Sequence, residues 1–482
     1  MAPSLLWFRQ DLRLTDNPAL TAALARREGL VALFILDDET AGEWAWGGAS
    51  RWWLHHSLAA LSKSIEGLGG RLILRKGCAE KILPEVAEEA GAGAAFWNRC
   101  YEPFAIARDK AIKSDLKAKG LEVESFNGSL LVEPWELKTG AGEPYKVFTP
   151  FWKALSAQYR DQAPLKAPTQ ITAPETLPRS DRLEDWKLLP DKPDWAGGLR
   201  EAWTPGEAGA QARLADFLDE ALADYKDGRN RPDKPFVSRI SPHLHWGELS
   251  PRQVWHATRL AAERNGDKRT ESSAWSFLRE VGWRDFSYNL LFNWPSLPDE
   301  NWKENFDGFP WAENEAGLRA WQRGRTGYPI VDAGMRELWS SGYVHNRVRM
   351  IVASFLIKDL LIHWREGERW FWDTLVDADL ANNAASWQWV AGSGADAAPY
   401  FRIFNPISQG EKFDPKGDYV RRWVPELKDL PDEVIHRPWE ADEAVLEKAG
   451  VVLDDSYPRP IVDHAQARRR ALEGYEKIKK SA

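Results

Sequence analysis

The chain has 482 residues, of which 43% are hydrophobic and 28% charged, and its formal net charge is -8. This length exceeds one ordinary core and predicts two domains, and the composition is typical of globular proteins. The negative charge excludes a generic polyanion binder, because affinity for phosphate comes largely from lysine and arginine; any nucleic-acid site must be a local basic patch.

Membrane and metal classes are disfavoured by the same composition. No stretch approaches the roughly 18 to 20 apolar residues that a membrane helix needs, and the start MAPSLLWFRQDL lacks a secretory signal pattern. Cys78 and Cys100 are too few for a disulfide framework or a four-cysteine zinc site. His243 and His245 have no third ligand nearby. We therefore expect a cytoplasmic monomer without a metal.

The first 130 residues alternate short apolar runs with helical patterns. The runs that predict buried strands are 4–8, 31–36, 72–74, 94–97 and 123–126. Helical patterns between them cover 19–27, 51–68, 79–90 and 106–119. The alternation predicts an α/β domain over residues 1–130, with a parallel five-stranded sheet covered on both faces.

The remaining chain changes character twice. Residues 131–205 contain ten prolines and predict an interdomain linker. From residue 206 helical patterns dominate, over 207–225, 250–264, 271–292, 316–323, 330–342, 346–365 and 367–375. We expect a larger all-α domain over residues 206–482, ending in a basic terminal helix over 468–480.

Polar side chains share one face at the start of the predicted helix 346–365. Asn346, Arg349 and Met350 lie on that face, whereas Val348 and Val352 turn toward the core. An amide, a guanidinium and a thioether therefore point together at something polar and flat. An arginine that pairs with a neighbouring carboxylate explains the same residues equally well.

Two carboxylates and two amides crowd the run DADLANN at 377–383. Cation binding fails the calcium-loop template, which requires an oxygen donor at the fifth position and glycine at the sixth, where Ala381 and Asn382 stand. Capping of a helix by one aspartate remains an alternative for one of the four residues. The aromatics of WQW at 387–389 and of DAAPYFRIFN at 396–405 favour a heteroaromatic ligand.

Two earlier segments carry further candidates. Glu280, Trp283 and Arg284 share a helix face by their spacing, and such a set can hold a base by its edge, face and phosphate. A surface ion pair beside a buried tryptophan is an equal alternative. The loop 225–241 contains Arg229, Arg231, Lys234 and Arg239 and ends in hydroxyls that suit a phosphate, although ordinary solvated surface has the same composition.

Together these segments resemble the photolyase and cryptochrome family. The run from His345 to Phe413 is similar to the family's flavin-binding signature nearly residue for residue, and the opening LLWFRQDLRLTDNPAL resembles its N-terminal strand and turn. The resemblance covers almost the whole chain and is weakest in the linker.

The resemblance implies that the all-α domain binds a U-shaped FAD. Arg349 would pair with Asp377, and Asn383 would lie near flavin N5. The residues that would hold the cofactor are Tyr225, Val237, Ser238, Arg239, Ile240, Ser241, Arg284, Asn346, Arg349, Asp377, Ala378, Asp379 and Asn383.

The resemblance also implies the sites for substrate and electrons. The catalytic lesion pocket would consist of Glu280, Trp283, Asn346, Met350 and Trp389. Contacts to damaged DNA would come from Glu280, Trp283, Arg347, Trp389 and Arg402. Electrons from the protein surface would pass along Trp311, Trp364 and Trp387.

The activity that the family implies is light-driven DNA repair by a carbon-carbon lyase that flips the damaged dinucleotide out of the duplex. Repair enzymes for (6-4) lesions carry histidines where Asn346 and Met350 stand, so cyclobutane pyrimidine dimers are the expected substrate. Plant-type cryptochromes carry aspartate where Asn383 stands. Blue-light signalling through a protein partner is the alternative.

A second chromophore is expected at an unusual place. Folate-binding relatives carry Asn and Glu where this chain has Phe104 and Ala105, which puts the usual antenna site in doubt. Glu43, Trp44 and Trp46 offer another stacking platform, as in the branch related to plant cryptochromes. We expect methenyltetrahydrofolate to bind there.

Overall fold

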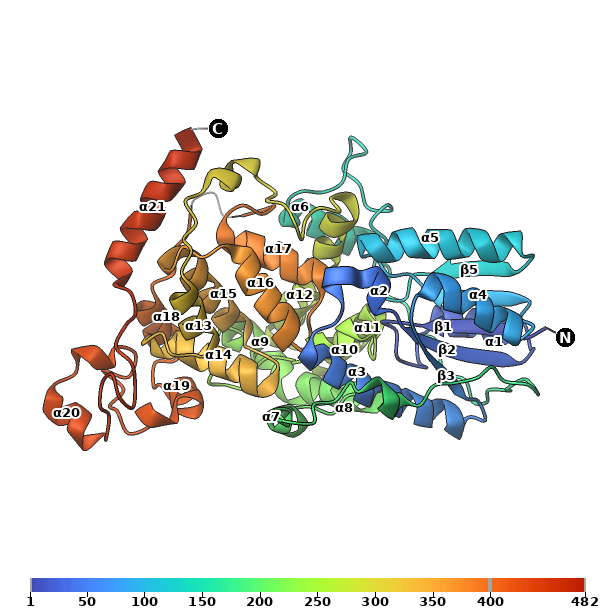
Figure 1. Ribbon diagram of the computed structural model, residues 1–482, viewed down its shortest axis with the longest axis horizontal. Coiled ribbons are helices and arrows are strands. Elements are labelled where there is room, and N and C mark those ends of the chain that lie inside the picture. The colour runs from blue at the N-terminus through green and yellow to red at the C-terminus, as the bar shows by residue number, and fades with distance from the viewer. Residues whose placement is uncertain (1, 398–400, 481–482) are drawn as a thin grey trace.

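The computed structural model describes residues 2–397 and 401–480 and shows a sheet-containing lobe beside a larger helical lobe (Figure 1). The sheet has five parallel strands in the order β3-β2-β1-β4-β5. Their bounds are β1 Ser4–Phe8, β2 Leu30–Leu36, β3 Leu72–Lys76, β4 Ala94–Asn98 and β5 Glu122–Phe126. The predicted α/β fold of the N-terminal part is confirmed.

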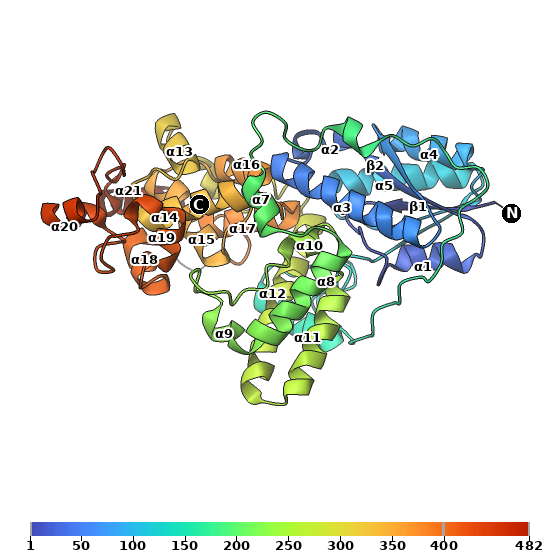
Figure 2. The ribbon, with the colours of Figure 1, turned by 90° about the horizontal axis from the view of Figure 1, so that it is seen from below.

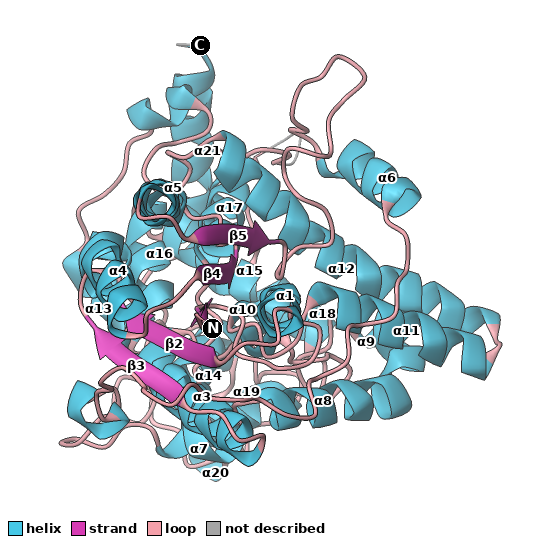
Figure 3. Cartoon of the chain, turned by 90° about the vertical axis from the view of Figure 1, so that its right-hand side faces the viewer, coloured by secondary structure: helices cyan, strands magenta, loops and turns pink. Residues whose placement is uncertain are grey.

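Helices cover both faces of this sheet because alternate strand residues point to opposite sides. Leu6 and Phe8 of β1 share a core with α1 (Pro18–Ala25) and α3 (Gly48–Gly67). The other face packs against α4 (Ala79–Glu89) and α5 (Pro103–Ala118) (Figure 3). Both faces are therefore buried, which accounts for the continuous apolar runs of the central strands.

The second lobe is helical, as predicted (Figure 2). Among the described residues its elements are α8 Glu207–Asp216, α9 Tyr225–Gly228, α10 Ser241–His245, α11 Pro251–Asn265, α12 Lys268–Asn293, α13 Glu315–Gln322, α14 Pro329–Ser341, α15 Asn346–Ser354, α16 Trp364–Thr374, α17 Leu380–Ala391, α18 Pro406–Phe413, α19 Asp418–Trp423, α20 Glu443–Lys448 and α21 His464–Lys480. The basic terminal helix is α21.

The proline-rich segment 131–205 is ordered and packs against both lobes. Its helix α6 (Phe148–Gln158) contacts α12, and Phe148 and Leu155 belong to the core of the helical lobe. Trp186 and Trp203, further along, belong to the core around α3. The segment thus wraps the molecule, and the exact domain boundaries remain a prediction.

The prediction of one helix over 346–365 is wrong. α15 ends at Ser354 and continues as a π-helical turn, Phe355–Asp359. Leu361 then takes a left-handed backbone with φ of 56°, which no continuing helix accepts. His363 starts α16 by accepting a hydrogen bond from the Arg365 backbone N–H at 3.2 Å.

The two lobes are joined by a buried glutamate, Glu248. Its Oε1 accepts hydrogen bonds from Trp53 Nε1 of α3 at 3.0 Å and from the Gly206 backbone N–H at 2.6 Å. Its Oε2 lies 2.5 Å from Nδ1 of His243, which accounts for this histidine structurally. Over residues 2–397 and 401–480, no helix is long and apolar enough to cross a membrane.

Candidate functional site

Three predicted cofactor residues form one connected chain of polar contacts. Ser241, the first residue of α10, donates a hydrogen bond from Oγ to Oδ2 of Asp377 at 2.6 Å. The same carboxylate accepts from the Arg349 guanidinium of α15 at 2.8 and 3.0 Å, the pairing that the sequence predicts. Arg349 is fixed further because Nε donates to the Val344 carbonyl at 2.8 Å. Segments 136 residues apart therefore meet at Asp377.

The loop 237–241 is held by residues that the sequence did not indicate. Arg213 of α8 donates to the carbonyls of Ser238 at 2.7 Å and Val237 at 3.2 Å. Arg239 has a left-handed backbone with φ of 54°, and its guanidinium lies 4.4 Å from the Trp203 ring and 5.1 Å from the Tyr343 ring. These contacts fix the loop and bring a positive charge beside its two serines.

Asp379 caps α17 and is the aspartate for which helix capping was an open alternative. Its side chain accepts from the Asn382 backbone N–H at 2.8 Å and from the Tyr288 hydroxyl at 2.5 Å. Burial opposes its ionisation, but His245, at 3.8 Å, the Arg284 charge and the Tyr288 hydroxyl outweigh burial. The pKa of Asp379 is therefore held below its ordinary value.

The other predicted cofactor residues lie around this centre. Asn383 is buried on α17 and donates from Nδ2 to the Glu368 carbonyl of α16 at 3.0 Å. Arg284 donates to the Ser129 carbonyl, and its guanidinium lies 4.8 Å from the Tyr288 ring. Tyr225, Ile240 and Ala378 are buried, and Val237 is half-buried.

Buried nitrogens without partners test whether this place fits a polar planar ligand. Arg239 Nε, both ring nitrogens of His245 and Nε2 of His345 have no hydrogen-bond partner in the described structure. Buried polar groups are normally hydrogen-bonded. Ring and guanidinium nitrogens on the segments that bear Ser241 and Asn346 are thus available to a phosphate-bearing heteroaromatic cofactor, and the residues present fit FAD.

The predicted catalytic glutamate has an arginine partner. Glu280 of α12 accepts from Arg229 at 2.6 Å, and both side chains are partly exposed. Arg347 of α15 donates to Asn230 Oδ1 at 2.8 Å, and its guanidinium lies 4.5 Å from the Phe413 ring. The end of α9 therefore contacts both the catalytic and the DNA-binding candidates, a role that the sequence did not reveal for Asn230.

The two tryptophans of the predicted lesion pocket are linked through α6. Trp283 stacks on Phe148 with ring centroids 3.6 Å apart and an interplanar angle of 10°. The Phe148 backbone N–H donates to Asp396 Oδ2 at 3.1 Å, and Trp389 Nε1 donates to the Asp396 carbonyl at 3.1 Å. Phe148 and Asp396 thus position both tryptophans. Residues 398–400 of the DAAPYFRIFN run lie outside the described residues.

Positive charge gathers beside these residues. Burial and the charges of Arg347, Arg349 and Arg229 lower the pKa of His345 to about 3. Burial and the charges of Arg229 and Arg402 also lower the pKa of Arg347. Asn346 and Arg402 are exposed, and Met350 is half-buried. A locally cationic surface therefore exists on a chain whose net charge is negative.

The three relay tryptophans lie in the same lobe, with a histidine between two of them. The His363 ring is 4.7 Å from Trp311 and 5.5 Å from Trp364. Trp387 is buried on α17, which packs against α16, and it contacts Phe371 edge-on at 5.0 Å. A Cβ on Gly367 would come within 2.1 Å of the Trp387 ring, so this glycine permits the close approach.

The predicted antenna residues lie at the junction of the lobes. Trp44 meets Trp372 of α16 edge-on at 5.4 Å, and Trp46 lies 5.0 Å from Trp246. Glu43 is exposed. Burial raises the pKa values of Asp299 and Glu368, and the negative charge of Glu43 raises them further. Both tryptophan rings therefore already rest against aromatic rings of the helical lobe.

The edge of the sheet between β1 and β4, where parallel folds usually bind ligands, is occupied by ion pairs. Arg9 contacts Asp109 at 2.6 Å, and Arg108 lies 3.6 Å from Asp37. Both guanidinium groups stack over Trp7, at 4.4 and 4.8 Å. Arg9 and Arg108 thus pair with carboxylates at this place, although Arg9 Nε has no hydrogen-bond partner in the described structure.

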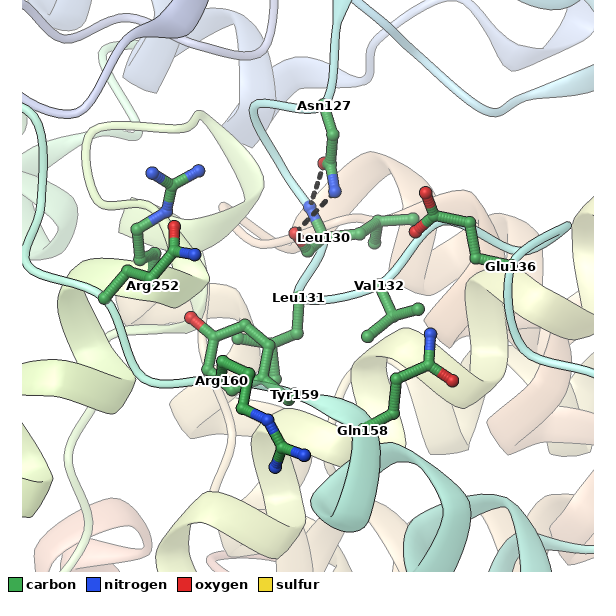
Figure 4. Close-up of a pocket in the computed structure, with 10 residues that line it drawn as sticks. Asn127, Leu130, Leu131, Val132, Glu136, Gln158, Tyr159, Arg160 and Arg252 are labelled. Atoms are coloured by element: carbon green, nitrogen blue, oxygen red, sulfur yellow. Dashed lines mark hydrogen bonds between the residues drawn. The ribbon is translucent and has the colours of Figure 1, made fainter.

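A separate pocket of about 280 Å³ opens between the linker and α11 (Figure 4). Residues 127–136 and 158–162 line it together with Arg252. None of the predicted cofactor, lesion or antenna residues lines this pocket.

Comparisons with known proteins agree with this geometry. Two family profiles match, "DNA photolyase" over residues 4–170 and "FAD binding domain of DNA photolyase" over residues 277–477. A deoxyribodipyrimidine photo-lyase from Agrobacterium fabrum is 55% identical over 480 residues, which are 100% of this chain and 99% of that protein. Cryptochrome-1 of Arabidopsis thaliana is 41% identical over 98% of this chain and 70% of its own length.

Solved structures give the same result. The crystal structure of a bacterial class III photolyase from Agrobacterium tumefaciens has a TM-score of 0.96 and 55% identity, covering 100% of this chain and 98% of that one. An archaeal photolyase from Sulfolobus tokodaii, crystallised with two FAD molecules, has a TM-score of 0.82 and 31% identity, covering 98% and 100% of the two chains.

Proposed function

This chain belongs to the DNA photolyase family, and from that premise we propose that it repairs cyclobutane pyrimidine dimers in DNA by light-driven electron transfer from reduced FAD. The observation that carries the proposal is the meeting of three helices. α17 packs against both α12 and α15. These helices carry Arg284, Arg349 and Asn383 of the expected cofactor set and the residues expected to hold the dimer, so both sets meet on the same packed helices.

FAD would be held by charges and dipoles that are already fixed. Ser238 and Ser241 offer hydroxyls to its phosphates, beside the positive charge of Arg239, and Arg213 keeps the loop in place. Arg349, anchored by Asp377, and the Asn383 amide would meet the edge of the isoalloxazine. When bound, reduced FAD would supply the electron for a light-driven cleavage of the dimer that is redox-neutral overall.

The chain's own residues bind and orient the dimer. Phe148 covers one face of Trp283, so a flipped base would pack on the other face. In its protonated form Glu280 would donate a hydrogen bond to a dimer carbonyl, and Arg229 orients its carboxyl group. Asn346 and Met350 would contact the bases from α15, while Arg347 and Arg402 neutralise phosphates.

The test replaces the glutamate. Glu280→Ala should lower the yield of dimer repair in blue light at equal FAD content, because the hydrogen bond to the dimer is lost. Glu271→Ala is the matched control, since Glu271 lies on the same helix and pairs with Arg259 at 2.9 Å. Repair by Glu280→Ala at the wild-type yield would remove this glutamate from the mechanism.

Signalling in blue light through a protein partner remains the second candidate, favoured by the 41% identity to a plant cryptochrome. Asn383 separates the two, because plant-type cryptochromes carry aspartate at the matching position. Full flavin occupancy without any repair of ultraviolet-treated oligo(dT), under blue light with a reductant, would favour signalling.

The proposed antenna is methenyltetrahydrofolate bound by Glu43, Trp44 and Trp46. The support is an aromatic junction with an exposed carboxylate close to α16, the helix whose Glu368 carbonyl accepts from Asn383. Trp44→Ala should remove a near-ultraviolet folate band from the purified protein. Trp135→Ala, a change at an exposed tryptophan whose ring contacts Tyr101, is the control; loss of the band in that variant instead would relocate the antenna.

A further inference from the structure

A buried lysine lies at the π-helical turn that ends α15. Lys358 is 1% exposed, and its Nζ donates hydrogen bonds to the Val390 and Arg402 carbonyls, both at 2.9 Å. Val390 stands near the end of α17, and Arg402 lies in the loop that follows it. The Lys358 side chain therefore links a carbonyl of α17 to a carbonyl of the loop that follows this helix.

The neighbouring Phe401 is held from two sides. Nζ of Lys358 lies 3.8 Å from the Phe401 ring centroid, a cation–π distance. Tyr475 of α21 stacks on the same ring at 4.7 Å with an interplanar angle of 5°. Phe306 and Phe309 complete the cluster. The loop backbone at Phe401 and Arg402 is thus set by a lysine, two aromatic side chains and the C-terminal helix.

The same turn also anchors α21. Asp359, next to Lys358, lies 2.6 Å from Nδ1 of His464, the first residue of that helix. Its carbonyl accepts from Arg470 at 3.2 Å. The π-helical turn therefore directs two adjacent side chains to different partners, one to the loop and one to the helix that stacks on the loop.

We propose that Lys358 and Tyr475 are positioning residues for damaged-DNA binding, which fix the loop so that the exposed Arg402 meets a phosphate beside the lesion pocket. The proposal rests on the proposed function. Phosphate contacts depend on geometry, because a side chain that must first be ordered loses affinity. The partners of Lys358 and Tyr475 named above are not among the residues expected to hold FAD, so loosening the loop should weaken DNA binding more than it lowers the yield of repair on bound DNA.

The variants are Lys358→Met, which keeps the length of the side chain without donors or charge, and Tyr475→Leu, at a half-buried position where folding is less at risk. Each should raise the Kd for dimer-containing duplex DNA about tenfold. FAD content should match the wild type, and the repair yield at saturating DNA should fall less than the affinity for DNA does. Tyr475→Phe, which keeps the stacking ring, should bind like the wild type.

A second measurement separates failure of this proposal from failure of the proposed function. The Phe404 backbone N–H donates to Ser354 Oγ at 3.2 Å, and its hydrogen exchange should speed up in Lys358→Met. Unchanged Kd and unchanged exchange in both variants would overturn the proposal. An affinity loss that comes with an equal loss of FAD or of yield at saturation would overturn it too. A wild-type protein that binds no dimer refutes the proposed function. Hydrogen exchange at Phe404 then still tests whether Lys358 fixes the loop.

Discussion

Asp377 is the residue on which the cofactor side of the site depends, because it accepts from both Ser241 and Arg349. Removing one partner of a buried ion pair leaves the other charge uncompensated, at a cost of about 3–5 kcal/mol. Asp377→Asn should therefore raise the Kd for FAD by on the order of tenfold or more, measured as flavin retained after dialysis. Glu426→Gln, which breaks the Arg336 pair elsewhere in the lobe, should retain FAD; equal retention by both variants would contradict this role.

Trp387 is the residue that tests the electron relay. Trp387→Phe should abolish photoreduction of oxidised flavin while the prereduced enzyme still repairs dimers. Gly367→Ala should slow photoreduction less severely, because its Cβ displaces the ring without removing it. Transient absorption measures both rates. Full photoreduction in Trp387→Phe would point to another path, for which Trp339 and Trp370, stacked at 5.8 Å, are candidates.

For single residues, the sequence indicated the candidate site residues themselves. It did not indicate the residues that hold them in place. Arg349 and Asp377 stand in runs whose polar residues share a face or a loop, so both could be singled out before any contact was known. Arg213 and Phe148 carry no such signal. Arg213 lies in a pattern typical of an ordinary helix and Phe148 in the predicted linker, and the role of each arises from packing between segments far apart in the chain.

Among the elements, strands were predicted within one or two residues because continuous apolar runs mark buried parallel strands. One continuous helix was predicted over 346–365, where the structure has two helices separated by a π-helical turn and a left-handed residue. Apart from Lys358 and Asp359 the residues at the break are apolar, all of them are compatible with a helix, and the left-handed Leu361 is stabilised by tertiary contacts. Buried π turns leave little periodic signal in a sequence.

The π-helical turn makes stability depend on pH. Burial lowers the pKa of Lys358 to about 7 from a usual 10.5. Between these values the unfolded chain binds more protons than the folded one, so the free energy of unfolding rises with pH, by at most about 1.4 kcal/mol per unit. Lys358→Met lacks this contribution. Urea unfolding at pH 7 and pH 9 measures the free energy of unfolding of wild type and variant. From pH 7 to pH 9 this free energy should rise more in the wild type than in Lys358→Met. An equal change in both proteins would contradict the role of Lys358 in the pH dependence.

For the whole molecule, Glu248 is the buried link between the lobes. Glu248→Ala leaves Trp53 Nε1 and the Gly206 N–H without their acceptor, at about 1–3 kcal/mol for each buried group. The Tm of the holoprotein should fall by several degrees. Glu263→Ala, at an exposed pair, should leave Tm within about a degree; equal shifts would show that the link contributes no more than a surface contact.

In the proposed arrangement FAD and the dimer bind to the helical lobe, and the antenna binds at the junction of the two lobes. Repair of cyclobutane dimers in light is the central claim. The most direct measurement is recovery of thymine absorbance in ultraviolet-treated oligo(dT), under blue light with a reductant and FAD-saturated protein. We expect recovery with the wild type in light and none in darkness. Absence of recovery in light at full flavin occupancy would contradict the account.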